Sequence, residues 1–397
     1  MQSTPTAQAA DFLIIGGGIA AASVGHWLAP HGKVVLLERE SQPGDHSTGR
    51  SAALFMESYG TPQVRGLTMA SRAFLEHPPP GFTEHPLLSP RGALMVGSPG
   101  QEQLLEDHWL VMHAISASAR RLTGDEACAM VPVLRREKIV GGLLEPDASD
   151  MDVHAIHQGY LRTLRRAGGT VVCDAGVTAL RRVGAVWRVE AGGQAYEAPV
   201  VINAAGAWAD HVAGLAGLPV LGLQPRRRSA MIFAPPAGVD ISSWPMAIGV
   251  TEDWYFKPDA GMLLGSPANA DPVDPQDVQP EEFDIATAIH RIEDMTTLTI
   301  RRPTRTWAGL RSFVPDGDLV GGFDAELPGF FWVAAQGGYG IQTSPAMGQA
   351  CAALLRGQPL PAHIARFGLT PAMLSPTRLQ RRAAAAGEPP STAIPAP

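Results

Sequence analysis

The chain has 397 residues, of which 45% are hydrophobic and 17% are charged. This length allows two domains or one large domain, and this composition excludes a largely disordered chain. The formal net charge of -7 provides no basic surface of the kind that binds nucleic acid, so no nucleic-acid partner is expected. The three cysteines, Cys128, Cys173 and Cys351, lack metal-ligand spacing. We therefore expect no metal site, no disulfide framework and a reducing, cytoplasmic location.

An almost uncharged run at residues 12–29 requires a membrane helix to be considered. The run contains a glycine triplet and interior polar residues, which make it a poor spanning helix. No basic segment precedes the run, and no convincing small-residue cleavage site ends it. We therefore expect no membrane span.

A glycine-rich turn near the N-terminus carries the strongest signal. The apolar residues 12–15 predict a buried parallel strand, after which a helical run begins. Gly16, Gly18 and Ala21 lie between them with the spacing of a dinucleotide-binding turn. Phosphate groups are favoured at such a helix start, because its N–H groups are free.

A second apolar run, residues 34–37, predicts the neighbouring strand and ends in Glu38. An acid at this distance binds an adenosine ribose hydroxyl and repels a 2′-phosphate. The loop at residues 41–51 is rich in small and hydroxylated residues. Such a loop can present N–H groups to a ligand, although it can equally be plain surface.

Helical patterns follow at residues 61–74, 101–118 and 124–130. The region 87–140 lacks phosphate-binding signals, and we interpret it as the first part of a second domain inserted into the nucleotide-binding domain. Residues 152–167 predict an amphipathic helix.

Further along the chain, a β-meander is expected at residues 177–196, followed by a strand from residue 200 that ends in a small-residue turn, 203–208. Residues 221–310 are rich in strand and turn signals. Alternation at residues 228–233 predicts a strand, and residues 254–265 predict a hairpin.

A further strand is expected at residues 296–300 and a late buried strand at 330–335. A third small-residue turn then leads to a helix over residues 346–355. The tail, residues 376–397, is rich in Ala, Pro and Arg, and we expect it to be disordered.

Three separated turns, at residues 16–21, 203–208 and 337–340, match one known pattern. With them, the chain resembles the D-amino-acid-oxidase-like family of FAD enzymes, which includes glycine and sarcosine oxidases. Within this family the chain is most similar to the D-arginine dehydrogenases. The segments that carry this similarity are residues 46–53, 59–65, 257–272 and 332–344.

The resemblance implies an α/β fold, with a Rossmann-like doubly wound FAD-binding domain and an inserted, mainly antiparallel β-sheet substrate domain. The FAD-binding domain would comprise residues 1–87, 144–220 and 312–375, and the substrate domain residues 88–143 and 221–311. FAD would bind without a covalent link. The residues expected to bind it are Gly16, Gly18, Ile19, Ala20, Glu38, Arg39, Ser47, Thr48, Gly49, Arg50, Ser51, Ala52, Ala53, Val177, Ala205, Gly206, Gly337, Gly338, Tyr339, Gly340, Ile341 and Gln342.

The resemblance also implies a carboxylate clamp of Arg228, Tyr255 and Arg311, with Tyr59 near the substrate α-carbon and the Gly338 carbonyl near the amino group. Guanidinium groups suit this role, because their planar forks fix a carboxylate in orientation as well as position. Taken alone, each of these arginines is also compatible with a solvated face or a structural ion pair.

The expected side-chain pocket departs from the D-arginine dehydrogenase pattern. Leu54 replaces a histidine, and Ala93 replaces the acid that faces the guanidinium of the substrate. Met56 and Gln342 complete the pocket residues that we expect. The clamp is kept while the pocket has lost its charge, so we expect uncharged or apolar side chains to be preferred over cationic ones.

The expected function is oxidative deamination of D-amino acids to 2-oxo acids and ammonia, with hydride transfer from Cα to flavin N5. The electron acceptor, a quinone or another oxidant, stays open. One alternative is an oxidase of the same fold that uses oxygen or acts on secondary amines. A nicotinamide-dependent dehydrogenase also fits the first glycine turn, but the second and third turns oppose it.

Overall fold

The computed structural model describes residues 7–379. Most of the expected tail lies outside these residues. Its first four residues, 376–379, are described, and Arg378 among them forms an ion pair with Asp316, with 2.9 Å between Nε and Oδ2. This part of the tail is therefore attached to the fold.

A six-stranded sheet forms the centre of the nucleotide-binding part, with the order β10-β3-β2-β14-β22-β21. The first five strands run parallel, and β21 is antiparallel to β22. In that order the strands are Thr170–Val172, Val34–Leu37, Phe12–Ile15, Val200–Asn203, Phe330–Ala334 and Val320–Phe323.

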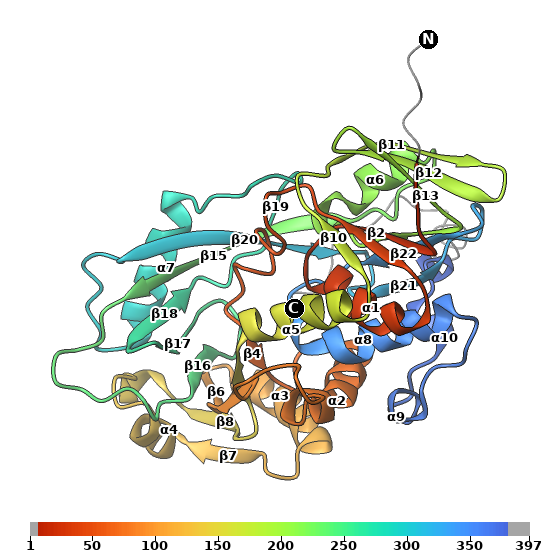
Figure 1. The fold of residues 1–397 in the computed structure, drawn as a ribbon. Coiled ribbons are helices and arrows are strands. Elements are labelled where there is room, and N and C mark those ends of the chain that lie inside the picture. The colour runs from red at the N-terminus through yellow and green to blue at the C-terminus, as the bar shows by residue number, and fades with distance from the viewer. Residues whose placement is uncertain (1–6, 380–397) are drawn as a thin grey trace, which may run out of the picture.

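Both faces of this sheet are buried, which explains why its strands read as unbroken apolar runs. Ile14 of β2 faces one core, while Leu13 and Ile15 face the other. Helices α1, α5 and α8 cover the first face, and α2 packs against α8 (Figure 1). These helices are Ile19–Leu28, Val153–Arg166, Gly340–Leu355 and Pro62–Glu76.

A smaller sheet and helix α6 cover the second face of the central sheet. The small sheet has the order β1-β13-β12-β11, and its last three strands are the predicted meander. These elements are β1 Gln8–Ala9, β11 Val177–Val183, β12 Val186–Ala191, β13 Gln194–Ala198 and α6 Ala209–Leu215.

A nine-stranded, mainly antiparallel sheet forms the other part of the molecule (Figure 1). Its order is β19-β15-β18-β17-β16-β6-β8-β7, with β20 paired to β15. The strands are β6 Ala93–Gly97, β7 Arg120–Thr123, β8 Gly141–Glu145, β15 Gln224–Phe233, β16 Met246–Gly249, β17 Tyr255–Asp259, β18 Met262–Ser266, β19 Asp271–Pro272 and β20 Arg305–Phe313.

The two faces of this sheet have different surroundings. One face packs with helices α4 and α7 into a large apolar core, and α3 packs near β6 and β8. The opposite face carries Tyr255, Met246 and Ile248 towards the six-stranded part. The helices are α3 Glu102–Ile115, α4 Gly124–Met130 and α7 Glu282–Met295.

Short elements join the two parts. A three-stranded sheet, β4-β9-β5, consists of Leu54–Phe55, Ser149–Met151 and Leu88–Pro90. The remaining elements are η1 Ala29–His31, η2 Arg136–Lys138, η3 Gly206–Trp208, α9 Ala362–Ala365 and α10 Pro371–Leu374. The predicted division into domains stays a prediction, and its boundaries after residues 143 and 311 fall inside β8 and β20.

The expected strand at residues 296–300 is wrong. Only an isolated bridge joins Thr296 to Leu134, and Thr296 lies at the end of α7, which the sequence analysis missed. The Thr296 hydroxyl donates to the Ile292 carbonyl at 2.6 Å and so satisfies one of the carbonyls at the helix end.

Helix α8 begins at Gly340, six residues before the predicted start, and includes Pro345. Proline has no N–H to donate to the Ile341 carbonyl. The Ser344 hydroxyl donates to this carbonyl instead, at 2.9 Å, which lets the helix continue through the proline.

No helix within residues 7–379 has both the length and the apolar character needed to cross a bilayer.

Candidate active site

The nucleotide end of the site is a cavity of about 610 Å³ at the carboxyl ends of β2, β3 and β14. Gly16 has a φ of +110°, and a Cβ there would lie 2.4 Å from the Ala204 carbonyl oxygen. A Cβ on Gly17 would lie 2.5 Å from the Glu38 Oε2 atom. The glycines are therefore required for the two neighbouring strand ends to approach this turn.

Glu38 lines this cavity. Its Oε1 atom accepts from the Glu40 backbone N–H at 2.9 Å. The Thr48 hydroxyl lies across the turn and accepts from the backbone N–H of Ile19, the first residue of α1, at 3.0 Å. The loop at residues 41–51 is thus anchored to the helix start.

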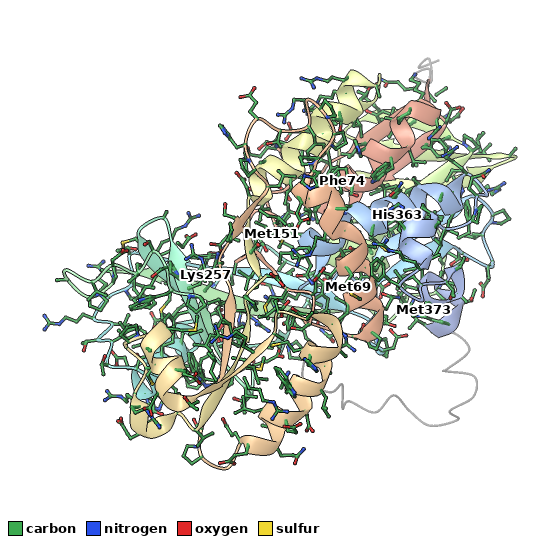
Figure 2. The ribbon with its side chains drawn as sticks, turned by 90° about the horizontal axis from the view of Figure 1, so that it is seen from below. Met69, Phe74, Met151, Lys257, His363 and Met373 are labelled. Atoms are coloured by element: carbon green, nitrogen blue, oxygen red, sulfur yellow. The ribbon has the colours of Figure 1, made fainter. Side chains whose placement is uncertain are left out.

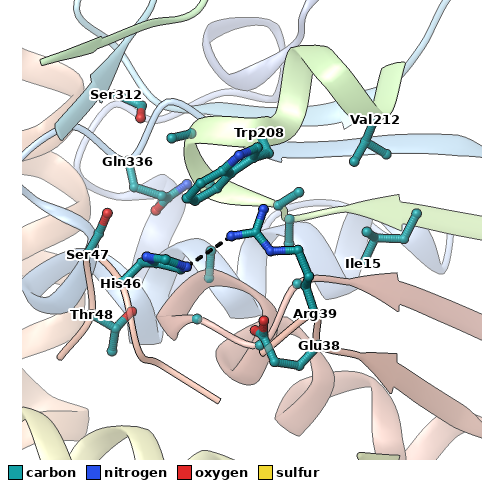
Figure 3. A pocket seen from close by; sticks show the side chains of 18 of the residues that line it. Ile15, Glu38, Arg39, His46, Ser47, Thr48, Trp208, Val212, Ser312 and Gln336 are labelled. Carbon is teal, nitrogen blue, oxygen red and sulfur yellow. Dashed lines mark hydrogen bonds between the residues drawn. The ribbon is translucent and has the colours of Figure 1, made fainter. Parts of the chain in front are cut away.

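Two aromatic side chains in this cavity were missed by the sequence analysis as ligand-binding residues. The Arg39 guanidinium lies 4.3 Å from the ring centroid of Trp208, and the ring centroids of His46 and Trp208 are 4.8 Å apart (Figure 3). The two rings and the guanidinium form one wall of the cavity. Trp208 is the last residue of the small-residue turn at residues 203–208, one of the three turns that match the family pattern, and this is the one signal in the sequence that pointed to it.

His46 supplies a test of whether a dinucleotide fits here. Its Nε2 atom lies 2.9 Å from Glu40 Oε1, while its Nδ1 atom is buried and has no partner within the described part of the chain. A buried polar atom without a partner is costly, and a ligand that hydrogen-bonds to it removes the cost. This atom, the Glu38 carboxylate and the glycine turn together fit the expected FAD.

A second cavity, of about 90 Å³, continues from the nucleotide cavity. The two cavities share Ile19, Ser47, Thr48, Leu310, Gln336 and Gly337. A Cβ on Gly338 would lie 2.8 Å from the Arg311 Nη1 atom, so a larger residue there would displace the guanidinium. The continuous space matches a flavin next to the predicted clamp.

Most of the predicted cofactor residues line these connected cavities. Those on the nucleotide side are Gly16, Gly18, Ile19, Ala20, Glu38, Arg39, Ser47, Thr48, Val177, Ala205, Gly206 and Gly337. Those further along are Arg50, Ser51, Ala52, Gly338, Gly340 and Ile341, with Ala53 and Gln342 in the third cavity. Gly49 lines none of the four described cavities, and Tyr339 lines an outer cavity next to the third.

The third cavity, of about 80 Å³, contains the predicted clamp. Arg228 and Arg311 both line it, and no carboxylate among residues 7–379 lies within ion-pair distance of either. Burial and the neighbouring Arg311 lower the pKa of Arg228 to about 10. Two buried guanidinium groups without an acid form a site for an anionic ligand.

Tyr59, Tyr255 and Gly338 line the same cavity, as the sequence analysis expected. The Arg228 Nε atom donates to the Asn269 carbonyl at 2.5 Å, which fixes its side chain against the sheet. The structure therefore brings all five predicted substrate residues together.

Glu252 is a further residue of the third cavity, and no sequence pattern pointed to it. It follows β16 in a left-handed conformation, with a φ of +52°. Burial raises the pKa of its carboxyl to about 7, although Arg228 and Arg311 act in the opposite direction. This carboxyl therefore changes charge near neutral pH beside the clamp.

The side-chain part of the third cavity is apolar. Its wall contains Leu54, Met56, Met95, Met151, Met246 and Ile248. Figure 2 shows Met151 between the sheet that carries Lys257 and the helix that carries Met69 and Phe74. Methionine side chains adapt to irregular apolar ligands.

Ala93 does not line this cavity, which corrects its predicted position in the wall. It packs behind the wall, in a cluster with Met56, Met246 and Ile248. Its partner in the neighbouring strand is Glu145.

The other acids near the wall are already paired. Asp150 accepts from Lys257 Nζ at 2.6 Å and from Arg91 Nε at 2.7 Å. Glu57 forms an ion pair with Arg72 at 2.8 Å. Glu252 is thus the acid of the cavity lining that no described residue pairs at ion-pair distance.

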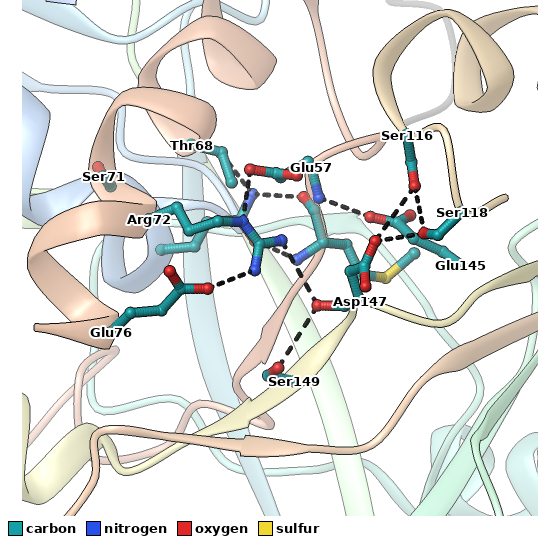
Figure 4. A network of polar contacts seen from close by, with 12 residues as sticks. Glu57, Thr68, Ser71, Arg72, Glu76, Ser116, Ser118, Glu145, Asp147 and Ser149 are labelled. Atoms are coloured by element: carbon teal, nitrogen blue, oxygen red, sulfur yellow. Dashed lines mark hydrogen bonds and ion pairs between the residues drawn. The ribbon is translucent and has the colours of Figure 1, made fainter. Parts of the chain in front are cut away.

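A polar network holds the segment that carries Met56 and Tyr59 (Figure 4). The Glu145 carboxylate accepts from the Glu57 N–H at 2.8 Å and from the Ser58 hydroxyl. The Gln342 amide lies on the other side, where its oxygen accepts from the Met56 N–H at 3.3 Å and its nitrogen donates to Thr68 Oγ1 at 2.9 Å. Gln342, predicted to bind ligand, therefore also positions this segment.

Comparison with known proteins identifies the family to which the chain belongs. The model of the DAO family, described as FAD dependent oxidoreductase, matches residues 11–354. The chain is 23% identical over 413 residues to the FAD-dependent oxidoreductase domain-containing protein 1 of Xenopus laevis, covering 89% of this chain and 81% of that protein. It is 22% identical over 383 residues to the glycine oxidase of Geobacillus kaustophilus (strain HTA426), covering 91% and 96%.

Solved structures share the fold. The L-proline dehydrogenase from P. horikoshii superposes with a TM-score of 0.80 at 19% identity, covering 95% of this chain and 99% of that one. Glycine oxidase from Geobacillus kaustophilus gives a TM-score of 0.79 at 22% identity, covering 92% and 99%. The chain belongs to the DAO family of FAD-dependent oxidoreductases, and its cofactor is FAD.

Proposed function

We propose that the chain oxidises D-amino acids with uncharged, apolar side chains to 2-oxo acids and ammonia. The observation that carries this proposal is the pair of buried arginines, Arg228 and Arg311, without an acid partner among the described residues. They lie where the flavin-end cavity meets a cavity with an apolar wall.

The residues of the chain would bind and orient the substrate. Arg228 and Arg311 would hold the carboxylate, the Gly338 carbonyl would accept from the amine, and the methionine wall would hold the side chain. These contacts fix the α-carbon next to the flavin-end cavity. Orientation of this kind can lower a barrier by roughly 7–11 kcal/mol.

FAD, when bound, supplies a two-electron acceptor for the hydride that leaves Cα. The amine must be neutral when the hydride leaves, because its lone pair forms the imine. Water then hydrolyses the imino acid to the 2-oxo acid and ammonia. Among the described residues, Glu252 is the one carboxyl that lines the cavity, and its raised pKa makes it a suitable proton acceptor for a substrate ammonium.

Oxidation of secondary amines is a second candidate. One observation favours it: an outer cavity of about 490 Å³ shares Met56, Tyr59, Met95 and Glu252 with the substrate cavity. A substituent on the amine would therefore have space. The solved relatives include an iminodiacetate oxidase from Chelativorans sp. BNC1, at a TM-score of 0.74 and 21% identity.

The test is product formation from enantiomer pairs. The holoenzyme is incubated with a dye acceptor and with D- or L-leucine, D- or L-methionine, or D- or L-phenylalanine, and the 2-oxo acid is measured. We expect product from the D-enantiomers only. Product from the L-enantiomers alone, or from N-methyl amino acids alone, would replace the proposal.

A further inference from the structure

Three consecutive arginines in β15 have different surroundings. Arg227 is paired with acids: its Nε atom lies 2.8 Å from Asp284 Oδ2, and its guanidinium also contacts Glu281 and Asp271. Arg226 and Arg228 point to the opposite face of the strand, because side chains alternate. Neither of them has an acid at ion-pair distance within residues 7–379.

Strand register places Arg226 beside the clamp. Arg226 is the partner of Arg311 in the antiparallel pair of β15 and β20. Side chains of directly opposed residues lie on the same face, with Cβ atoms about 4.5–5.5 Å apart. Arg226, Arg228 and Arg311 therefore occupy one continuous face of the sheet.

Arg226 lines the outer cavity, while Arg228 and Arg311 line the inner one. Arg65 of α2 lines the outer cavity as well. Its Nη1 atom donates to the Gly60 carbonyl at 2.5 Å, and burial lowers its pKa below the usual value. No acid within the described ranges lies at ion-pair distance of Arg65.

The acids that line the outer cavity do not pair with Arg226 or Arg65. Asp316 pairs with Arg378, Asp107 accepts from Gln103 at 2.9 Å, and Glu252 borders the clamp. The rest of the wall is largely apolar and includes Val111, Met112 and Phe313. Arg226 and Arg65 thus have no acid at ion-pair distance among the described residues, and they line a largely apolar cavity that opens on the substrate site, as the clamp arginines do.

We propose that Arg226 and Arg65 form a second anion subsite for a carboxylate of the substrate, beyond the one at Arg228 and Arg311. The inference rests on the proposed function, because it takes the inner arginines as the first carboxylate site. It names the substrate class as amino acids with a second carboxylate. Because the apolar wall takes the side chain, this group would be carried on the substituent of the amine. A carboxylate at the far end of the side chain is the alternative that the turnover assay below tests.

The test compares ligands that cannot be oxidised. Monocarboxylates from pentanoate to octanoate and the matched dioates are titrated into the holoenzyme, and changes in flavin absorbance give the Kd of each. For the chain length that spans the two subsites, we expect the dioate to bind roughly tenfold more tightly than the monocarboxylate of the same length. This is the difference expected for one charge-assisted hydrogen-bonded contact. In Arg226→Gln and Arg65→Gln this ratio should fall close to one.

Two variants serve as controls. Arg226→Lys keeps the positive charge and should retain part of the ratio, and Arg302→Gln, at an exposed position away from the cavities, should retain all of it. FAD content shows that each variant is folded. A ratio near one at every chain length in the unmodified enzyme overturns the subsite, as does an unchanged ratio in both glutamine variants.

Failure of the proposed function gives a different result. If the proposed function is wrong, Arg228→Met leaves the Kd of the monocarboxylates unchanged, and this holds for any result with the dioates. The source of the second carboxylate follows from turnover of N-carboxymethyl-D-alanine against N-methyl-D-alanine, and of D-2-aminoadipate against D-norleucine. The pair in which the added carboxylate raises turnover more identifies the position of the carboxylate. If the added carboxylate raises turnover in neither pair, the substrate class is wrong.

Discussion

At the scale of single residues, the unpaired arginines determine what the site can bind. Replacing Arg311 or Arg228 by methionine leaves one guanidinium for the substrate carboxylate. We expect kcat/KM for any amino-acid substrate to fall by an amount equivalent to roughly 2–5 kcal/mol, the range for removing one member of a buried charge pair. The measurement is steady-state kinetics together with FAD content, which should stay at the level of the unmodified protein. Normal efficiency in both variants would show that the carboxylate binds elsewhere.

Glu252 makes ligand binding depend on pH. Its pKa is raised to about 7 by burial, so its carboxyl is largely neutral at pH 6 and ionised at pH 8. An ionised Glu252 repels an incoming carboxylate and competes with it for Arg228 and Arg311. We expect the Kd of a monocarboxylate ligand to rise several-fold from pH 6 to pH 8.

The matched variant is Glu252→Gln, in which this rise should disappear because the amide carries no charge at either pH. A Kd that rises equally in both proteins would assign the titration to another group. The titration of Glu252 also makes the stability of the folded protein depend on pH. Since the folded-state pKa lies above the ordinary value of 4.5, the free energy of unfolding decreases as the pH rises from about 4.5 to about 7 and is then constant with respect to this group.

The apolar wall predicts side-chain preference. A guanidinium placed against Leu54 and Met246 would be buried without a paired acid, and such a loss costs about 3–5 kcal/mol. Apolar side chains instead gain about 25 cal/mol for each Å² that they bury. We expect kcat/KM for D-leucine, D-methionine or D-phenylalanine to exceed that for D-arginine and D-lysine.

A designed acid tests the same point. Ala93→Glu is a poor choice, because residue 93 lies opposite the buried carboxyl of Glu145 and behind the wall. Leu54→Glu places a carboxylate in the wall itself and should raise the D-arginine to D-leucine ratio, whereas Leu54→Gln should raise it less. If the unmodified enzyme already prefers D-arginine, Glu252 is the acid that binds the side chain.

At the scale of elements, the turn between β2 and α1 controls cofactor binding. In Gly16→Ala the new methyl group would lie 2.4 Å from the Ala204 carbonyl, at a φ that alanine rarely adopts. We expect the variant to lose most of its bound FAD. The measurement is the FAD released on heating, which the unmodified protein should release completely because the link is noncovalent.

The control is Gly214→Ala in α6, where a Cβ would contact nothing within 4 Å. This variant should keep its FAD, and its stability should rise by about 0.5–1 kcal/mol because glycine costs that much inside a helix. Equal FAD contents in Gly16→Ala and the unmodified protein would contradict the assigned role of the turn.

Local sequence patterns predicted some elements well and others poorly, for physical reasons. β2, β3 and β14 are apolar on both faces, so their runs are unmistakable, and the β17–β18 hairpin has a clear turn between two apolar runs. Helix α7 was missed because residues around it are turn-rich, and the side chain of Thr296 at its end caps a helix although threonine favours strands. Pro345 hid the start of α8, since the compensating Ser344 contact is visible only in three dimensions.

At the scale of the whole molecule, the site lies where two sheets meet. The glycine turn could be predicted from the spacing of its residues, whereas the clamp residues were predicted only through the resemblance to a known family. Met95, Met151 and Met246 of the apolar wall, Glu252, and the packing of His46 and Trp208 with Arg39 could not be predicted, because these residues come together from distant segments. Ala93 was predicted to line the cavity but lies behind its wall. Its position depends on the register of its strand, which no local sequence pattern reveals.

The most direct test of the account is anaerobic reduction of the bound flavin. The purified holoenzyme is mixed without oxygen with D-leucine or L-leucine, and flavin absorbance is followed. We predict complete bleaching by D-leucine, none by L-leucine, and much slower bleaching by D-leucine in Arg311→Met. A flavin that dithionite reduces but that neither enantiomer of any amino acid bleaches would contradict the account.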